Sequence, residues 1–223
     1  MPSPEKIRQQ MERLTAELVG LSLCDRQNFP ATRNVGSGYC EVGVGSKGSL
    51  SYALKNISYQ DIYTELDRLH SYNMRMLDGA LIHMMYRFKD NQLEAHRLAF
   101  FPSPFLEEFQ NNPDIYIEDE VYAEVIMKNI VPFPLRFDFD CRKEVAVEID
   151  HPKSHLTLGQ YQNCRIPVSA PLTPHNFISF VLQNFYNTAY QKYSNRLTIF
   201  ADSFEKSITK REKELLHIHL PNN

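Results

Sequence analysis

The chain has 223 residues, of which 43% are hydrophobic and 12% aromatic, which suffices for one large or two small globular domains and favours a sheet-containing protein. Its formal net charge of −3 excludes a general basic field, so any contact with nucleic acid must come from a local patch. The four cysteines form no C-x-x-C pair, and neither a signal peptide nor an apolar run of about 18 residues is present; we therefore expect a cytoplasmic protein with reduced thiols, no zinc ribbon and no membrane contact.

The first third of the chain predicts two helices separated by a loose segment. Ser3 and the following proline and glutamate form a helix start, and apolar residues at three- and four-residue steps predict an amphipathic helix over 4–21. This helix would pack on its own domain or on a partner. Residues 24–55 form a glycine-rich loop region with one short strand near 39–44, whose glycine spacing differs from that of a phosphate loop. A capping-box pattern predicts a second helix over 58–70.

The middle of the chain predicts the sheet. Residues 79–88 and 93–101 alternate as two strands of a hairpin, and 115–127 is mainly extended. A proline-started apolar helix should follow from residue 174, and a last helix should lie near 202–216, so that helices occupy 174–216. We predict a single α+β domain over 1–223 with its sheet core at 79–168. This antiparallel sheet would have about five to seven strands, with helices from both chain ends packed on one face.

The most informative stretch lies at 133–168. Residues 134–140 alternate strictly between apolar and polar, and residues 144–150 alternate again, which predicts an antiparallel hairpin. His151-Pro152 would end the second strand, and 154–158 reads as a third short strand. If these strands are neighbours, their polar side chains share one face.

That polar face suggests a site, although an antiparallel sheet ordinarily has one wet face. Proton transfer at a phosphate needs an imidazole, a carboxylate and a guanidinium, and this stretch supplies all three types. The candidate catalytic residues are Arg136, Asp138, His155 and His151, and the candidate phosphate-binding residues are Arg165, Arg87 and Arg97. A zinc or manganese site would use Asp138, Asp140, His151 and His155. Because H-x-x-x-H spacing is typical of metal ligands only on a helix, we predict no metal and no cofactor.

Several short motifs in the second half of the chain form a family-like pattern. They are R-F-D-F-D at 136–140, HPKSHLTLG at 151–159, RIP at 165–167 and the proline-started helix ending in NFY at 184–186. With these motifs the chain resembles a family of uncharacterised bacterial proteins known as a domain of unknown function. The resemblance implies a small cytoplasmic bacterial protein, of the kind encoded among mobile or phage-defence genes. It carries no activity over to individual residues.

Two functions remain open. The first is an accessory or binding subunit that docks a larger protein partner through its N-terminal helix and a sheet edge, in a bacterial assembly acting on nucleic acid. The many tyrosines suit such an interface. The alternative is a small metal-independent nuclease. In it His155 would act as general acid or base, Arg136 would hold the phosphate and Asp138 would orient the imidazole.

Overall fold

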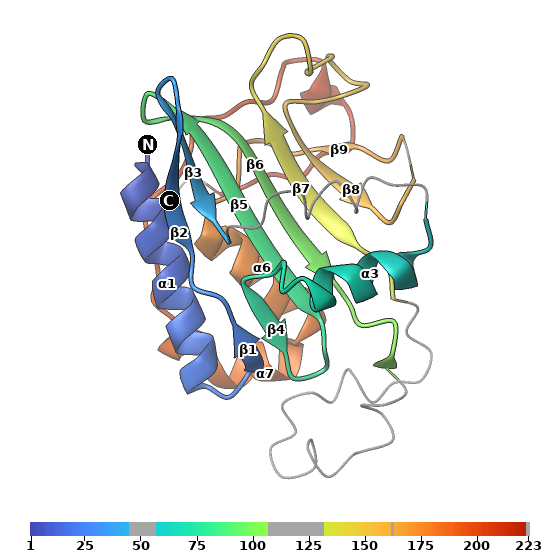
Figure 1. Ribbon diagram of the computed structural model, residues 1–223. Helices are drawn as coiled ribbons and strands as arrows, with labels where there is room; N and C mark the ends of the chain where they lie inside the picture. Colours follow the sequence, from blue (N-terminus) through green and yellow to red (C-terminus); the bar gives the residue numbers. More distant parts are fainter. Residues whose placement is uncertain (45–56, 107–131, 162, 222–223) are drawn as a thin grey trace.

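The structure is a computed structural model, and it describes residues 1–44, 57–106, 132–161 and 163–221. Its centre is one antiparallel sheet, which has nine strands within these ranges (Figure 1). They are β1 (Cys24–Gln27), β2 (Ala31–Gly36), β3 (Tyr39–Gly43), β4 (Met74–Met76), β5 (Leu81–Lys89), β6 (Gln92–Phe101), β7 (Leu135–Asp140), β8 (Ser154–Leu158) and β9 (Ile166–Pro167). The α+β class is confirmed. The strand number exceeds the expected range because pieces as short as β4 and β9 leave no alternation to detect.

Strand β5 organises the sheet. On one side it is followed by β6, β7, β8 and β9, and its other edge is shared by β4 and β3. Strand β1 lies beyond β4, and β2 lies beyond β3. The hairpin predicted from 79–101 is thus present as β5 and β6, with β7 and β8 added beside it.

Helices from both chain ends cover one face of the sheet (Figure 1), as predicted. They are α1 (Pro4–Gly20), α6 (Pro174–Phe185) and α7 (Asn187–Tyr193). Ser3 Oγ accepts a hydrogen bond from Lys6 N at 3.3 Å, and Thr173 Oγ1 caps α6 in the same way, so both predicted N-caps are present. The apolar stripe of α1, formed by Ile7, Met11, Leu14 and Leu18, is buried in the main core; this face of α1 therefore packs on its own domain and is closed to a partner.

Among the described elements, α3 (Tyr59–Arg68) lies over part of the opposite face of the sheet. Ile62, Tyr63 and Leu66 of this helix pack on Leu81, Ala99 and Phe101 in a second, smaller core. The polar side chains of β7 and β8 lie beside this core on the same face, because residues two apart on a strand point the same way.

The strand predicted for 144–150 is wrong. Within 141–153 the chain forms turns with a single bridge between Val147 and His151, and β7 pairs directly with β8. Val147 is 53% exposed, so the alternation there has no core to face, and Ile149 adopts a positive φ of 73° that interrupts an extended strand. Asp140 Oδ1 accepts a hydrogen bond from Arg142 N at 3.0 Å, which starts the first turn.

The last predicted helix is also wrong. Apart from the short 3₁₀ turns η1 (Ser194–Arg196) and η2 (Glu212–Glu214), residues 194–221 have no helix. Their backbone bonds β9 and the segment after it instead: Ile218 N donates to Pro167 O at 2.8 Å, and Ser207 N donates to Ser169 O at 3.0 Å. Of the remaining expectations, the extended stretch at 115–127 and the loop residues 45–55 lie outside the described residues.

Candidate functional site

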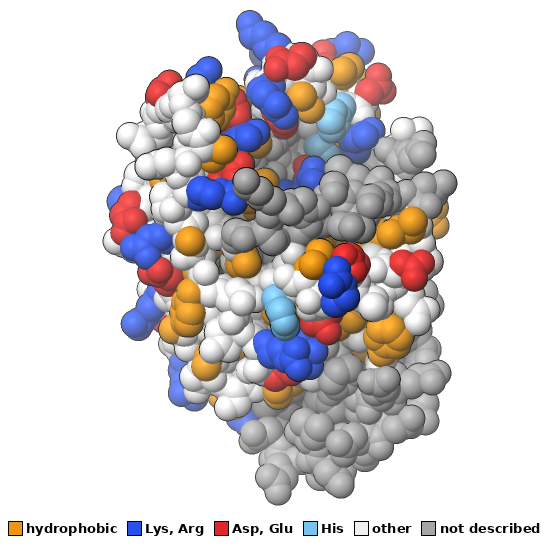
Figure 2. Space-filling model, in the orientation of Figure 1, with side chains coloured by type: hydrophobic (Ala, Val, Ile, Leu, Met, Phe, Trp, Pro, Cys, Tyr) orange, Lys and Arg blue, Asp and Glu red, His pale blue; other side chains and the backbone are white. Residues whose placement is uncertain are grey.

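Strand register brings the predicted site residues together on the face that carries α3. Asp138 of β7 lies between Arg97 of β6 and His155 of β8, directly across the ladder from each. Arg136, two residues before Asp138, lies opposite Thr157. Figure 2 views this side of the molecule, where acidic, basic and histidine side chains gather toward the upper end. The predicted common polar face is therefore formed by β6, β7 and β8.

Asp138 is held by two guanidinium groups. Arg97 Nε lies 2.8 Å from Oδ1 and Arg136 Nε lies 3.2 Å from Oδ2, while the Asp138 side chain is only 13% exposed. Burial by itself raises the pKa of this carboxyl, but the two arginines outweigh burial and lower the pKa below its ordinary value. Asp138 is therefore an ionised carboxylate at neutral pH.

His155 is a neutral, buried imidazole at neutral pH. Its Nδ1 donates a hydrogen bond to the carbonyl oxygen of Pro152 at 2.8 Å, which leaves the lone pair on Nε2. That Nε2 lies 4.0 Å from Asp138 Oδ2, beyond hydrogen-bond distance, and burial lowers the pKa of His155 to about 4. Pro152, which was not a predicted site residue, thus orients the imidazole.

His151 lies beside His155, with ring centroids 4.9 Å apart. Its Nδ1 donates to Val145 O at 2.7 Å, so the ring also fixes the turn after β7. Arg165 Nη1 lies 3.4 Å from the carbonyl oxygen of Asp150. Its charge helps to lower the pKa values of Arg136 and His155, which places Arg165 at the border of the cluster.

Arg87 and Asp140 lie apart from the cluster around Asp138, and each has another partner. Arg87 Nε contacts Glu41 at 3.4 Å and its guanidinium lies over the Tyr39 ring, so Arg87 belongs to the β3–β5 region. Asp140 is paired with Arg142 at 2.6 Å. Within the described ranges no three His, Cys, Asp or Glu side chains converge on one point, so the zinc or manganese site is not formed there.

Three features of this face were missed from the sequence. Thr157 Oγ1 and His83 Nε2 are buried and, among the described residues, have no hydrogen-bond partner. A pocket of about 350 Å³ lies beyond the ends of β7 and β8, next to the start of α3. It is lined by Tyr59, Pro132, Phe133, Pro134, Gly159, Gln160 and Tyr161. The only signal for it in the sequence is the pair of prolines on either side of Phe133, which keeps that ring out of the strand.

Fold and site together define an α+β protein whose antiparallel sheet is packed by helices on one face and carries a half-buried arginine–aspartate cluster on the other. The chain belongs to the family described as an uncharacterized conserved protein (DUF2290), whose model matches residues 23–220. No curated protein and no solved structure shows significant similarity to it. In the part of the chain that the structure describes, no helix is both long and apolar enough to span a membrane.

Proposed function

We propose that the protein is a nucleic-acid-binding accessory subunit, and that the cluster of Arg97, Asp138 and Arg136 holds a phosphate group of the bound strand. The setting that the sequence motifs suggest is an assembly in the bacterial cytoplasm, of the anti-phage defence type. Four cysteines without disulfides suit that compartment.

The supporting observation is the excess of guanidinium groups over carboxylates. Arg97 and Arg136 both approach Asp138 through Nε, and within the described ranges their terminal nitrogens form no hydrogen bond or ion pair with another side chain. A guanidinium has five N–H donors in a planar fork that matches a phosphate. Asp138 thus fixes the direction of both forks, and with Arg165 nearby the cluster keeps net positive charge. A chain of negative net charge would hold nucleic acid at such a local patch.

The binding test uses fluorescence anisotropy with a labelled single-stranded oligonucleotide, measured over a range of salt concentrations. Arg136→Gln leaves Arg97 to neutralise Asp138, and it should weaken binding about tenfold, because a hydrogen bond to a charged group contributes roughly 1.5–3 kcal/mol. It should also reduce the dependence of affinity on salt by about one phosphate contact. Arg13→Gln removes the same charge from α1 on the opposite layer and is the matched control. Equal losses in the two variants would reject the proposed site.

Partner docking is proposed at the free edge of the sheet, since the apolar face of α1 is occupied. All six residues of β2 (Ala31–Gly36) are exposed, and this strand pairs only with β3 among the described strands. An exposed strand edge is a template for a strand of another chain. A larger protein should co-purify with the wild type and be lost with Asn34→Pro, which cannot donate an edge N–H. Retention of that protein by Asn34→Pro would place docking elsewhere.

A ribonuclease is the second candidate, favoured by the free Nε2 of His155 beside the phosphate position. Because the pKa of His155 lies at about 4, the imidazole is in its neutral form at neutral pH, and its Nε2 carries a lone pair that can act as the base. Asp138 contacts the arginines rather than Nδ1, so the carboxylate would position the phosphate and not the imidazole. An RNA cleavage assay should show loss of activity in His155→Ala and unchanged activity in the exposed control His219→Ala. Equal cleavage by wild type and His155→Ala rejects this candidate.

A further inference from the structure

The aromatic pocket lies next to the arginine cluster on the same face. Leu135 pairs with Leu158 at the last rung of the β7–β8 ladder, and Gly159 N donates to Pro134 O at 2.7 Å just beyond it. Residues two apart on a strand point the same way, so Pro134 and Arg136 share a face and lie roughly 7 Å apart. Pro134 of the pocket lining and Arg136 of the proposed phosphate site are therefore neighbours on this face.

The lining of the pocket is aromatic, and its rings are presented in different ways. Tyr161 is 77% exposed and Phe133 is 46% exposed, so both keep ring faces open to solvent. Tyr59, which also lines the pocket, is held in place by its hydroxyl, which donates to Pro102 O at 2.5 Å. Gln160 Nε2 donates to Ile57 O at 2.9 Å, which ties the loop after β8 to the start of α3.

We propose that this pocket receives one base of a single strand of nucleic acid whose phosphate lies on Arg97 and Arg136; this inference rests on the proposed phosphate site. Exposed aromatic rings stack on any base, whereas the bases of a duplex are already stacked on one another. The volume of about 350 Å³ lies in the range of small-ligand pockets. Neighbouring guanidinium groups supply charge complementarity for the strand that carries the base.

The defining test compares two labelled strands of equal length, one with normal bases and one made of abasic nucleotides. Both strands carry the same phosphates, so they differ only in what the pocket can hold. Base–aromatic stacking corresponds to a preference of roughly 5- to 100-fold for the normal strand. Tyr161→Ala and Phe133→Ala should remove most of that preference and leave the abasic affinity unchanged. Tyr161→Phe keeps the ring and should retain it.

Two controls separate this inference from the phosphate site. Phe29→Ala removes an aromatic ring that is 54% exposed and lies outside the pocket, and it should leave the preference intact. Arg136→Gln should weaken binding of both strands by a similar factor. If the wild type binds both strands equally and Arg136→Gln weakens both, the pocket proposal is overturned and the phosphate site stands. If the wild type binds neither strand, both proposals fail.

Discussion

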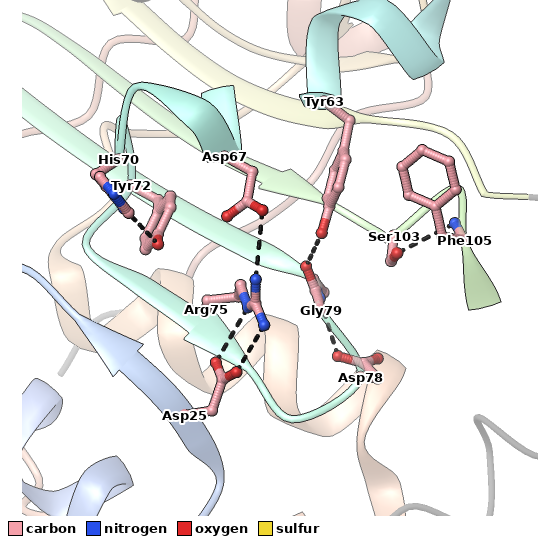
Figure 3. Close-up of polar contacts among 11 residues, drawn as sticks. Asp25, Tyr63, Asp67, His70, Tyr72, Arg75, Asp78, Gly79, Ser103 and Phe105 are labelled. Carbon is pink, nitrogen blue, oxygen red and sulfur yellow. Dashed lines mark hydrogen bonds and ion pairs between the residues drawn. The ribbon is translucent and has the colours of Figure 1, made fainter. Parts of the chain in front are cut away.

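Two clusters on one face of the sheet both consist of arginine and aspartate, but in opposite proportions. In the first, one arginine lies between two carboxylates: Arg75 Nη2 is 2.8 Å from Asp25 and Nη1 is 3.3 Å from Asp67 (Figure 3). Its Nε also donates to Asp25, at 3.2 Å. In the second, one carboxylate lies between two arginines: Arg97 Nε lies 2.8 Å from Asp138 Oδ1 and Arg136 Nε lies 3.2 Å from Oδ2.

The difference in proportion separates a structural contact from a candidate binding site. All three nitrogens of Arg75 are engaged, and its partners come from β1 and α3, so this cluster joins three elements and every nitrogen of its guanidinium already has a carboxylate partner. Around Asp138 each carboxylate oxygen faces an arginine Nε, whereas the terminal nitrogens of the two guanidinium groups form no hydrogen bond or ion pair with another side chain in the described ranges. An arginine next to an aspartate therefore says little until its remaining donors are counted.

The largest expected effect comes from removing the whole charge cluster around Asp138. Arg97→Gln, Arg136→Gln and Asp138→Asn combined leave no buried charge without a partner, so the fold should persist. The affinity for a single-stranded oligonucleotide should fall about 100-fold or more, since two charged donors are lost. Anisotropy gives the affinity and urea unfolding gives the stability. A folded triple variant that binds as tightly as wild type would contradict the assignment.

The next largest effect is expected in the Arg75 cluster, where a substitution should lower stability and leave binding unchanged. Arg75→Ala leaves Asp25 and Asp67 partly buried and unpaired, and the free energy of unfolding should fall by about 2 kcal/mol. Oligonucleotide affinity should stay unchanged in the folded protein. Arg75→Lys should recover only part of the stability, because one ammonium does not reproduce a contact to two carboxylates. Urea denaturation midpoints give the stability of both variants. Weaker oligonucleotide binding by Arg75→Ala would contradict the distinction between a structural cluster at Arg75 and a binding cluster at Asp138.

The two clusters also differ in how far the sequence predicts them. Alternation along 134–140 and 154–158 correctly places Asp138 and His155 on one side, and pairing of these strands then sets them opposite each other. The same alternation at 144–150 misleads, because a period of two does not reveal whether a neighbouring strand exists. Arg75, Asp25 and Asp67 come from three elements, so no local spacing signals their contact. Local spacing does not signal the aromatic pocket either. Phe133 and Tyr161 both line it because β7 pairs with β8.

A pH experiment extends the comparison to a carboxylate with no arginine. Asp78 is buried, and Tyr186 Oη donates to both of its oxygens at 2.9 Å. Burial raises the pKa of Asp78 to about 6, the opposite direction to Asp138. The pKa of Asp78 in the folded state is thus above its unfolded value near 4. The contribution of Asp78 to stability is therefore fully present below pH 4 and is lost as the pH rises from about 4 to 6.

Asp78→Asn should remove that loss. At pH 8 the variant should be more stable than wild type by about 2 kcal/mol, and at pH 4 the two should be similar. For Asp138 the sign is reversed: its lowered pKa gives stability that is present above about pH 4 and lost below it. Urea unfolding at a series of pH values measures both effects. If the stability of Asp78→Asn relative to wild type does not increase between pH 4 and 8, burial does not raise the pKa of Asp78.

The smallest expected effect tests where the Asp138 cluster ends. Arg165 acts on Arg136 and His155 through its charge rather than by contact, so Arg165→Gln should weaken oligonucleotide binding only about 2- to 5-fold. Arg211→Gln is the control, because Arg211 pairs with Glu148 at 3.4 Å on the surface. Loss of the nearby positive charge should also raise the pKa of His155 above its value of about 4, which NMR titration of the ring detects. If the pKa of His155 rises but oligonucleotide binding is unchanged, Arg165 lies near the imidazole but outside the path of the nucleic-acid strand. If the pKa rises and binding weakens, the positively charged binding surface extends from β6 to the segment before β9.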